Sequence, residues 1–367
     1  MFGEAEQQAQ TAYDLADVQS SGELIAVTLS GPDTYYEYRG QGFGLQFSMA
    51  EAFANSIGTR LRMEMVSDTA ELVRRLISGE ADMIALELAT NTISSAYIKA
   101  ITVLPNHWAV REESKDLAES VKQWWNPQLR TQYLEAEQTR QNPINRIRRH
   151  SHPEMLSRYK GTICAYDALF IRHAQLIGWD WRLLAAQCYQ ESAFDSNAVS
   201  WAGAQGLMQL MPSTAEQVGI SRMELLTPDK NIEAAVKYLT RLQSTFSYIS
   251  RRNERIRFML AAYNGGVGHI RDAMTLAIED GFSAQSWNDV APYILRLEQP
   301  RYYRHPKVKF GYLRGNETVD YVNQIMLRWT DYRRMALPHS NVRLHDVSRQ
   351  QPSRVRPRSE YLKDSIP

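Results

Sequence analysis

A single carboxylic acid stands out among the residue types that could do chemistry. Glu191 closes an apolar, helix-like run and is followed directly by Ser192. A lone carboxylic acid beside apolar surface has its charged form disfavoured, so its pKa rises and it can donate a proton near neutral pH. The leaving oxygen of a glycosidic bond needs such a proton donor. We therefore take Glu191 as the candidate general acid, although a glutamate at a helix end is more commonly a solvated side chain.

Neutral side chains that suit a carbohydrate follow the acid in three short segments. A polar loop, the run GLMQLMP at 206–212 and the run AYNGG at 262–266 come in that order. Hydroxyl and amide groups can hydrogen-bond to sugars, and aromatic or methionine surface can lie against sugar faces. The candidate binding residues in these segments are Ser200, Gln209, Met211, Tyr263 and Asn264. The plainer interpretation makes the methionines core residues and the AYNGG run a helix stop, so only the combination favours a sugar-binding cleft.

The elements that must position these residues are helices. Asp180 can cap a helix that runs to Glu191, and Ser213 with Glu216 has the spacing of a capping box before a short helix. Apolar stripes over 232–242 and 256–263 predict two more helices with buried faces. The region from about 161 to 337 is therefore expected to be a mainly α domain.

Four ordered motifs in this region resemble one known family. They are ES at 191–192, GLMQLMPSTA at 206–215, AAYNGG at 261–266 and GNETVDYV at 315–322. In this order and spacing, the segment from about 161 to 330 resembles the soluble-lytic-transglycosylase family, whose fold is similar to goose-type lysozyme. The resemblance implies a lysozyme-like catalytic domain over 161–337 that acts on peptidoglycan.

Carried onto this sequence residue by residue, the resemblance implies one catalytic residue and a surrounding cleft. Glu191 matches the catalytic acid of the family, and Ser200 matches the serine that contacts the N-acetylmuramyl group. The other residues implied to contact substrate are Ser192, Gln209, Met211, Tyr263, Asn264, Glu317 and Tyr321. An aromatic and basic insertion over 287–314 separates the last motif from the AYNGG run. No metal and no cofactor are implied.

The chemistry that the resemblance implies needs a single carboxyl group. Glu191 would protonate the leaving oxygen of the β-1,4 bond between N-acetylmuramic acid and N-acetylglucosamine. As a carboxylate it would then deprotonate the muramyl 6-hydroxyl, which attacks the anomeric carbon and gives a 1,6-anhydromuramyl end. Asp195, the nearest acid in sequence, is expected to be a turn former.

Two other functions remain open from the sequence. A lysozyme-type muramidase would hydrolyse the same bond with two carboxylates and water. A non-catalytic peptidoglycan-binding sensor is the alternative from a different class, and it would place the main function in the N-terminal region. The intact set of acid and cleft residues favours the lytic enzyme over the sensor.

The N-terminal region alternates strand and helix signals. Strand-type runs at 23–29, 61–65 and 83–86 are separated by helix-type runs at 45–53 and 69–77. This alternation predicts a parallel βαβαβ sheet, and the region resembles the first lobe of a type II solute-binding domain. The overall fold class is thus an α+β multidomain protein, with one α/β lobe followed by a mainly α lysozyme-like domain.

The second lobe of a solute-binding domain has no room in this sequence. Only about twenty residues separate the strand at 83–86 from a returning strand near 107–108, where a lobe would need roughly a hundred. We expect that the region no longer clamps a small molecule and instead packs on the catalytic domain or docks to the wall or a partner. The alternative is a vestigial lobe that only stabilises the protein.

Composition and local sequence character exclude some partners and predict the domain boundaries. The net charge of +1 provides no global field to attract nucleic acid, and no run of eighteen apolar residues could span a membrane. The two cysteines, Cys164 and Cys188, are expected to be buried and unpaired. The expected divisions are a flexible N-terminus over 1–22, the lobe over 23–126, a linker over 127–160, the catalytic domain over 161–337 and a disordered tail over 338–367.

The combination of the two regions resembles a membrane-bound member of the family. It implies peptidoglycan strands as the partner and the periplasm as the location. Association with the outer membrane would depend on a segment absent from this sequence, and a monomer is the favoured state.

Overall fold

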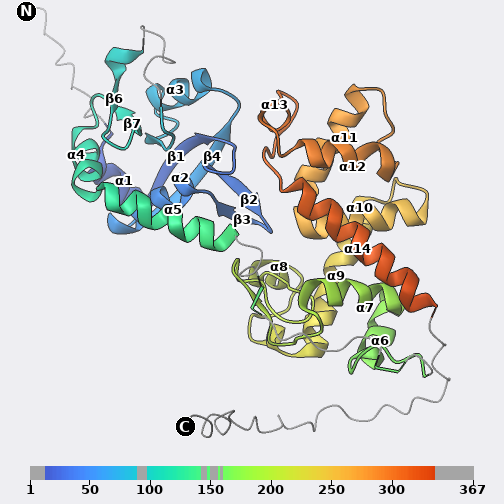
Figure 1. Cartoon of the computed structure of the whole chain (residues 1–367). Helices are drawn as coiled ribbons and strands as arrows, with labels where there is room; N and C mark the ends of the chain where they lie inside the picture. The colour runs from blue at the N-terminus through green and yellow to red at the C-terminus, as the bar shows by residue number, and fades with distance from the viewer. Residues whose placement is uncertain (1–12, 89–96, 142–146, 149–155, 158–159, 335–367) are drawn as a thin grey trace, which may run out of the picture.

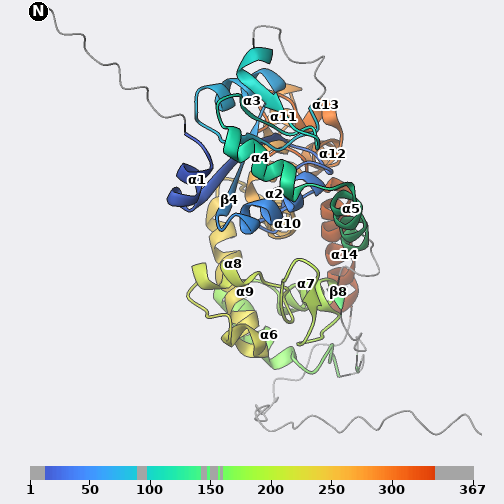
Figure 2. The same ribbon diagram turned by 90° about the vertical axis from the view of Figure 1, so that its left-hand side faces the viewer.

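A computed structural model describes residues 13–88, 97–141, 147–148, 156–157 and 160–334. Figure 1 shows two regions: an N-terminal lobe with a sheet and a larger helical region, whose helix α7 (Trp181–Ser192) carries the candidate acid. Figure 2, viewed from the side of the lobe, shows the lobe in front of the upper helices of the helical region. The expected tail over 338–367 lies outside the described residues.

A five-stranded sheet in the order β4-β1-β5-β7-β6 forms the centre of the lobe. Its strands are β1 (Glu23–Leu29), β4 (Arg60–Val66), β5 (Met83–Ile84), β6 (Ile101–Val103) and β7 (Ala109–Arg111). β1 is parallel to β4 and to β5, with Ala26 opposite both Met63 and Met83. The predicted parallel βαβαβ unit is therefore confirmed. The predicted returning strand is instead a hairpin, because β6 and β7 are antiparallel to each other and β7 is antiparallel to β5.

Helices cover both faces of this sheet. They are α1 (Leu15–Ser21), α2 (Leu45–Ser56), α3 (Thr69–Ile77), the short 3₁₀ turn η2 (Ile98–Ala100), α4 (Lys115–Trp124) and α5 (Pro127–Gln141). One face buries Phe53, Trp108 and the apolar side of α2 and α4. The other face buries Leu72 and Leu76 of α3. Each face thus has its own core, as a sheet needs when both of its sides are apolar.

Two segments expected outside the lobe belong to it. α1 lies within the segment 1–22 that was expected to be flexible: Asp14 caps it, and Val18 is fully buried. α5 lies in the segment 127–160 that was expected to be a linker, and the Glu137 carboxylate, buried there, accepts a hydrogen bond from Ser48 of α2. Both segments are polar in composition, so their few tertiary anchors were not visible as patterns.

A two-stranded hairpin between β1 and α2 projects from the lobe and was not predicted. It consists of β2 (Tyr36–Tyr38) and β3 (Gln41–Phe43), with Tyr38 paired to Gln41. The two residues of its turn, Arg39 and Gly40, both have positive φ, at 52° and 76°. This is the backbone of a type I′ hairpin turn, in which the first position rarely holds an arginine.

The helical region is built around one large apolar core. Its helices are α6 (Asp167–Ile177), α7 (Trp181–Ser192), α8 (Pro212–Gln217), α9 (Pro228–Thr245), α10 (Arg252–Gly265), α11 (Val267–Glu279), α12 (Trp287–Arg296), α13 (Pro300–Tyr303) and α14 (Gly315–Arg333). A 3₁₀ turn, η4 (Glu224–Leu226), precedes α9, and β8 (Ile147–Arg148) pairs with β9 (Val199–Ser200). The predicted mainly α domain is confirmed.

Of the two helix N-caps predicted from the sequence, one is observed and one is not. Asp180 caps α7 through its side chain, as predicted. The predicted capping box of Ser213 and Glu216 is wrong: α8 begins at Pro212, and its N-cap residue Met211 makes no side-chain cap. Proline at the first helical position sets the start two residues earlier, because it needs no hydrogen-bond acceptor for its nitrogen.

The hairpin and the insertion before α14 join the two regions. Tyr36, Phe43 and Ala202 form a small buried cluster with Trp201 and Tyr312 packed against it. The Tyr38 and Trp201 rings stack with centroids 5.5 Å apart. Two further contacts link the regions: the backbone N–H of Tyr312 donates to Ser30, and the Arg314 guanidinium donates to the Tyr36 hydroxyl.

No helix among the described residues is long and apolar enough to cross a membrane. Within the same part of the chain, no group of three or more histidine, cysteine, aspartate and glutamate side chains could hold a metal ion. Cys164 and Cys188 are both buried and free, which confirms that prediction.

Candidate active site

The candidate acid lies near the C-terminal end of α7. Glu191 is 1% exposed, and Ala193 ends the helix in the left-handed conformation. Burial raises the pKa of the Glu191 carboxyl group, as expected for a proton donor. The negative end of the α7 dipole also disfavours its charged form.

Tyr321 of α14 holds this carboxyl group in place. Its hydroxyl donates to Oε1 of Glu191 at 2.6 Å and accepts from Nε2 of Gln187 at 3.2 Å. All three side chains lie on the packed faces of α7 and α14. The acid is thus fixed by a chain of two hydrogen bonds between neighbouring helices.

Arg39, from the tip of the N-terminal hairpin, reaches the same carboxyl group. Its Nη2 donates to Oε2 of Glu191 at 2.9 Å, and its Nη1 donates to the backbone oxygen of Gln209 at 2.9 Å. The side chains of the pair are 10% and 1% exposed. The ion pair with Arg39 acts against burial and lowers the pKa of Glu191. In this conformation a guanidinium group therefore occupies the outer side of the acid.

Glu317 lies on the other side of the hairpin tip. It accepts a hydrogen bond from the Tyr38 hydroxyl at 2.6 Å and is 4.0 Å from the Arg314 guanidinium. Its charge is close enough to act on Glu191, whose pKa it raises. The structure thus brings Glu317, predicted to contact substrate, near the acid, but its carboxylate is already engaged by the lobe.

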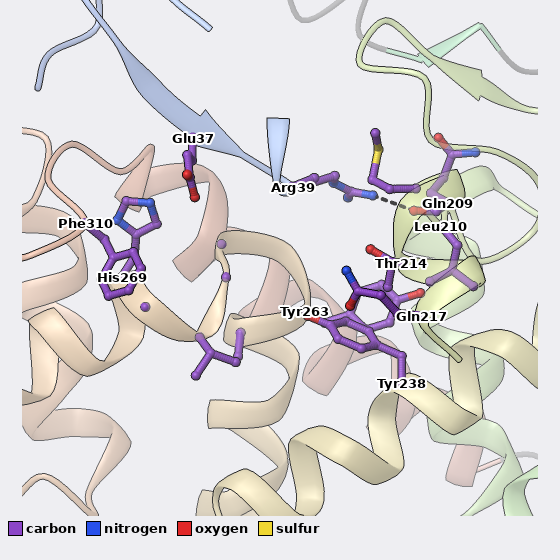
Figure 3. A pocket seen from close by; sticks show the side chains of 17 residues that line it. Glu37, Arg39, Gln209, Leu210, Thr214, Gln217, Tyr238, Tyr263, His269 and Phe310 are labelled. Carbon is purple, nitrogen blue, oxygen red and sulfur yellow. Dashed lines mark hydrogen bonds between the residues drawn. The ribbon is translucent and has the colours of Figure 1, made fainter. Parts of the chain in front are cut away.

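A cavity of about 250 Å³ opens beside the hairpin tip. Figure 3 shows Arg39 and Gln209 at one end, the rings of Tyr238 and Tyr263 along the floor, and Glu37, His269 and Phe310 at the other end. Its walls therefore come from the hairpin, the 206–212 loop, and helices α8, α9, α10 and α11. Hydrogen-bonding groups and aromatic faces alternate along it, which suits a chain of sugars.

The 206–212 loop presents Gln209 with a strained backbone. Gln209 has φ of 46°, and its Nε2 donates to the backbone oxygens of Ala198 and Gly206. Its Oε1 is buried and has no hydrogen-bond partner. A residue other than glycine with positive φ is uncommon and often marks a functional site.

Asn231 of α9 fixes the shape of this loop. It accepts from the backbone N–H of Met208 and donates to the backbone oxygens of Gln205 and Leu225. A Cβ atom at Gly206 would lie 2.4 Å from the Asn231 amide nitrogen, so the loop requires glycine there.

The other predicted binding residues fall into two groups. Tyr263 and Met211 line the cavity, and the Tyr263 hydroxyl donates to the backbone oxygen of Met208 at 2.8 Å. Three residues have their polar groups engaged elsewhere. Ser192 donates to the backbone of Cys188, Asn264 accepts from Thr318, and Ser200 accepts from the backbone N–H of Ala204. Asp195 forms the predicted turn, since its side chain accepts from the backbone N–H of Asn197.

The residues that sequence reasoning missed come mostly from the lobe. Tyr38 and Arg39 lie 279 and 152 positions from their partners Glu317 and Glu191. The available signal was the run YYEYRGQGFG at 35–44, whose aromatic residues and glycines are typical of a hairpin. Nothing in the run indicates where its tip would dock.

Comparisons with known proteins bear on the enzyme class. Residues 168–284 match the family model described as "Transglycosylase SLT domain", a segment that includes Glu191, Gln209 and Tyr263. The chain is 28% identical to "Membrane-bound lytic murein transglycosylase F" of Shewanella pealeana over 86% of this chain and 87% of that protein. It is 38% identical to a protein of the same name from Aeromonas hydrophila, over 48% of this chain and 35% of that protein.

The first alignment extends over 426 positions, more than the 367 residues of this chain, so the Shewanella protein contains stretches without a counterpart here. Among solved structures, the lobe is similar to the arginine-bound form of domain 1 from TmArgBP, with 18% identity, a TM-score of 0.26, and coverage of 32% of this chain and 97% of that one. The family matches confirm the enzyme class predicted from the motifs: residues 168–284 of this chain form a transglycosylase SLT domain of the lytic transglycosylases.

Proposed function

We propose that this protein cleaves the β-1,4 bond between N-acetylmuramic acid and N-acetylglucosamine in peptidoglycan and leaves a 1,6-anhydromuramyl end. The observation that carries this proposal is the buried carboxyl group of Glu191, hydrogen-bonded by Tyr321 beside a sugar-sized cavity. A buried carboxyl group of raised pKa is a proton donor, and one such group is enough for an intramolecular reaction.

The reaction proceeds in two proton transfers. Glu191 first gives its proton to the glycosidic oxygen, so the bond from that oxygen to the muramyl anomeric carbon breaks and N-acetylglucosamine leaves with a hydroxyl group. The Glu191 carboxylate then takes the proton of the muramyl 6-hydroxyl, whose oxygen bonds to the anomeric carbon. Glu191 ends protonated as it began, and no water is consumed.

The cavity residues hold the strand during these steps. The free Oε1 of Gln209 can accept a hydrogen bond from a sugar hydroxyl or an N-acetyl N–H. The rings of Tyr238 and Tyr263 offer apolar faces to the sugar rings. Tyr321 is a positioning residue, because it contacts the acid rather than the sugar.

Arg39 must move before a strand can react. Its guanidinium lies where the leaving oxygen would approach Glu191, and the ion pair favours the carboxylate over the proton-bearing acid. Withdrawal of the hairpin tip removes both obstacles at once. The conformation described here is therefore the one before substrate enters.

Hydrolysis is the competing reaction. It would need a second carboxylate, and Glu317 is close enough to Glu191 to raise its pKa. Digestion of purified cell wall in ¹⁸O-labelled water separates the two. The lytic reaction gives unlabelled anhydro ends, lighter by one water than the hydrolytic product. Incorporation of one ¹⁸O at each new reducing end would replace the proposal with a muramidase. Absence of any cleavage would favour the sensor function.

The substrate also sets the proposed location. Peptidoglycan lies in the cell envelope, and the two relatives are named as membrane-bound proteins. We place this protein in the periplasm, next to the wall, with no cofactor.

A further inference from the structure

The end of the cavity away from Gln209 contains groups that take no part in the proposed proton transfers. Figure 3 shows Glu37, His269 and Phe310 there. Glu37 comes from β2 of the lobe, His269 from α11 and Phe310 from the insertion before α14. Of these three, only His269 lies within residues 168–284, the segment that matches the transglycosylase SLT domain. Two of the three groups are therefore supplied from outside that domain.

The Glu37 carboxylate is available as a hydrogen-bond acceptor. It is exposed, forms no ion pair with another described residue, and accepts one long hydrogen bond from the Tyr35 hydroxyl at 3.4 Å. Its neighbour Tyr36 is buried in the cluster with Phe43 and Ala202. Glu37 is thus held at the cavity by contacts that do not involve the hairpin tip.

His269 faces this end with two ring nitrogens that need partners. Its side chain is 3% exposed, and neither nitrogen has a hydrogen-bond partner among the described residues. Burial lowers the pKa of His269 to about 4, and the nearby backbone groups of Gly311 and Glu37 oppose this only in part. The ring is therefore neutral near neutral pH, with one donor and one acceptor. A buried polar group without a partner costs free energy, which a ligand that satisfies it would recover.

The start of α11 adds backbone donors to the same wall. Its first residues, from Gly266 to His269, line the cavity. The first N–H groups of a helix have no acceptor within the helix, and no side chain caps α11. The positive end of the helix dipole lies with them.

The Phe310 ring provides apolar surface beside these polar groups. It is 40% exposed and meets the His269 ring edge to face, with centroids 6.0 Å apart. A Cβ atom at Gly268 would lie 2.4 Å from the Phe310 ring, so glycine allows the ring to lie against α11. The buried Asp272 carboxylate accepts from the backbone N–H of Phe310 and fixes the insertion there. Phe310 follows α13, which lies on the side of the helical region that faces the lobe (Figure 1).

These groups together exclude charged ligands and favour an amide. An anion would be repelled by the Glu37 carboxylate, and a cation would meet the positive end of α11. A secondary amide is neutral and satisfies both sides. Its N–H can donate to Glu37, and its oxygen can accept from His269 or from the backbone at the start of α11. An acetamido group also has a methyl group, which suits the Phe310 ring.

We propose that this end of the cavity binds the acetamido group of one sugar in the glycan strand, and that Glu37 and His269 determine the preference for it. The proposal rests on the proposed function, because it takes the strand as the ligand of the cavity. Packing of the lobe on the catalytic region, one of the roles expected from the sequence, thereby completes a sugar-binding site. Glu37 is then a substrate-binding residue contributed by the lobe.

Calorimetric titration of the full chain with two sugar tetramers tests this assignment. One is a tetramer of N-acetylglucosamine, and the other is the same tetramer without its acetyl groups. Glu37→Ala should weaken binding of the acetylated tetramer about tenfold, as expected when a hydrogen bond to a charged group is lost, and should affect the deacetylated tetramer less. Glu51→Ala, at an exposed position of α2 in the same lobe, is the matched control and should change neither affinity.

Three results would overturn the proposal. One is no saturable binding of the acetylated tetramer, and another is no effect of Glu37→Ala on either tetramer. The third is an effect confined to the deacetylated tetramer, because Glu37 would then bind an ammonium group.

His269→Leu separates ligand binding from a structural role. Since neither ring nitrogen has a partner, an apolar side chain of similar size should not lower the unfolding temperature. The same change should weaken binding of the acetylated tetramer about two- to tenfold. Lower stability with unchanged binding would remove His269 from the site.

The titration is independent of cleavage, because neither tetramer contains a muramyl unit. If walls are cleaved in the ¹⁸O experiment but tetramer binding does not depend on Glu37, the reaction stands and this site is refuted. If binding depends on Glu37 but no wall is cleaved, the site stands and the reaction is refuted.

Discussion

The helical region and the N-terminal lobe each bring one ionisable group to the same point, and they support it differently. Glu191 lies on a 12-residue helix and is hydrogen-bonded by a residue of a second, 19-residue helix. Arg39 lies at the tip of a hairpin with three residues in each strand, and its backbone has positive φ. One half of the ion pair is thus held by an extensive core, and the other half by a small projection that docks through the side chains of a few residues.

The difference indicates which half of the site is fixed for chemistry. A helix packed on two sides keeps its side chain within a narrow range of positions, as an acid catalyst requires. A hairpin that docks through a limited set of aromatic and polar contacts is less firmly held than such a helix. The following predictions test this division, beginning with the side expected to have the larger effect.

Replacement of the acid tests the helical side. Glu191→Gln should lower cleavage of purified cell wall by about 10³-fold, because the amide keeps the shape of the side chain but cannot donate a proton in general acid catalysis. Release of anhydromuramyl products, followed by mass spectrometry, measures the loss. Glu216→Gln, at an exposed position of α8, is the matched control and should keep full activity. A folded Glu191→Gln protein with activity near that of the control would exclude Glu191 as the acid.

Removal of the hairpin cation tests the lobe side. Hydrogen bonds to charged groups contribute about 1.5–3 kcal/mol, so Arg39→Ala should favour the open site and raise activity about tenfold or more. Since Arg39 lowers the pKa of Glu191, the same change should move the alkaline limit of activity to higher pH. Arg62→Ala, an exposed arginine of the same lobe, should change neither quantity. A loss of activity in Arg39→Ala would instead assign this arginine a part in the reaction.

Tyr321→Phe separates positioning from chemistry on the helical side. The hydroxyl donates to the carboxylate and so lowers the pKa of Glu191; its removal should raise that pKa. Activity falls with pH as the acid loses its proton, and this fall should therefore shift to higher pH in the variant. The rate at low pH should drop by up to about tenfold, as expected when one hydrogen bond that positions the acid is lost. A purely structural role for Tyr321 would change the rate but not the pH profile.

The smallest effects are expected at the cleft residues. Gln209→Ala and Ser200→Ala each remove about one neutral hydrogen bond, of about 0.5–1.5 kcal/mol, and should lower activity about two- to tenfold. Gln209 should show the larger effect, because its Oε1 is free while the Ser200 hydroxyl already accepts from Ala204. Kinetics on wall fragments of defined length would measure both. The reverse order would mean that Ser200 changes its partner when substrate binds.

Much of the catalytic half was predictable because its signals are local. Glu191, Gln209 and Tyr263 lie in short motifs whose spacing follows from helices and a glycine-dependent loop. The parallel sheet was predictable for the same reason, since alternating strands and helices can be recognised within single segments. Tyr321 was included on its motif alone, and its contact with the acid required the packing of α7 on α14.

The lobe side was not predictable because its contacts are distant in sequence. Arg39 meets Glu191 across 152 positions, and Ser30 meets Tyr312 across 282. The helix α1 was missed because its anchors, Asp14 and Val18, form no periodic pattern. The second lobe was expected to be absent on length alone, but length did not reveal that the insertion before α14 takes the facing position.

The connection of the hairpin and the acid by one polypeptide has a consequence for their pairing. Arg39 and Glu191 associate in a unimolecular step, so dilution of the protein does not release the acid. The hairpin is already docked on the helical region through its aromatic and polar contacts, so free arginine, or a peptide that copies residues 36–43, would compete poorly. Displacement of Arg39 therefore depends on a ligand that binds the cleft or the lobe, rather than on the amount of protein present.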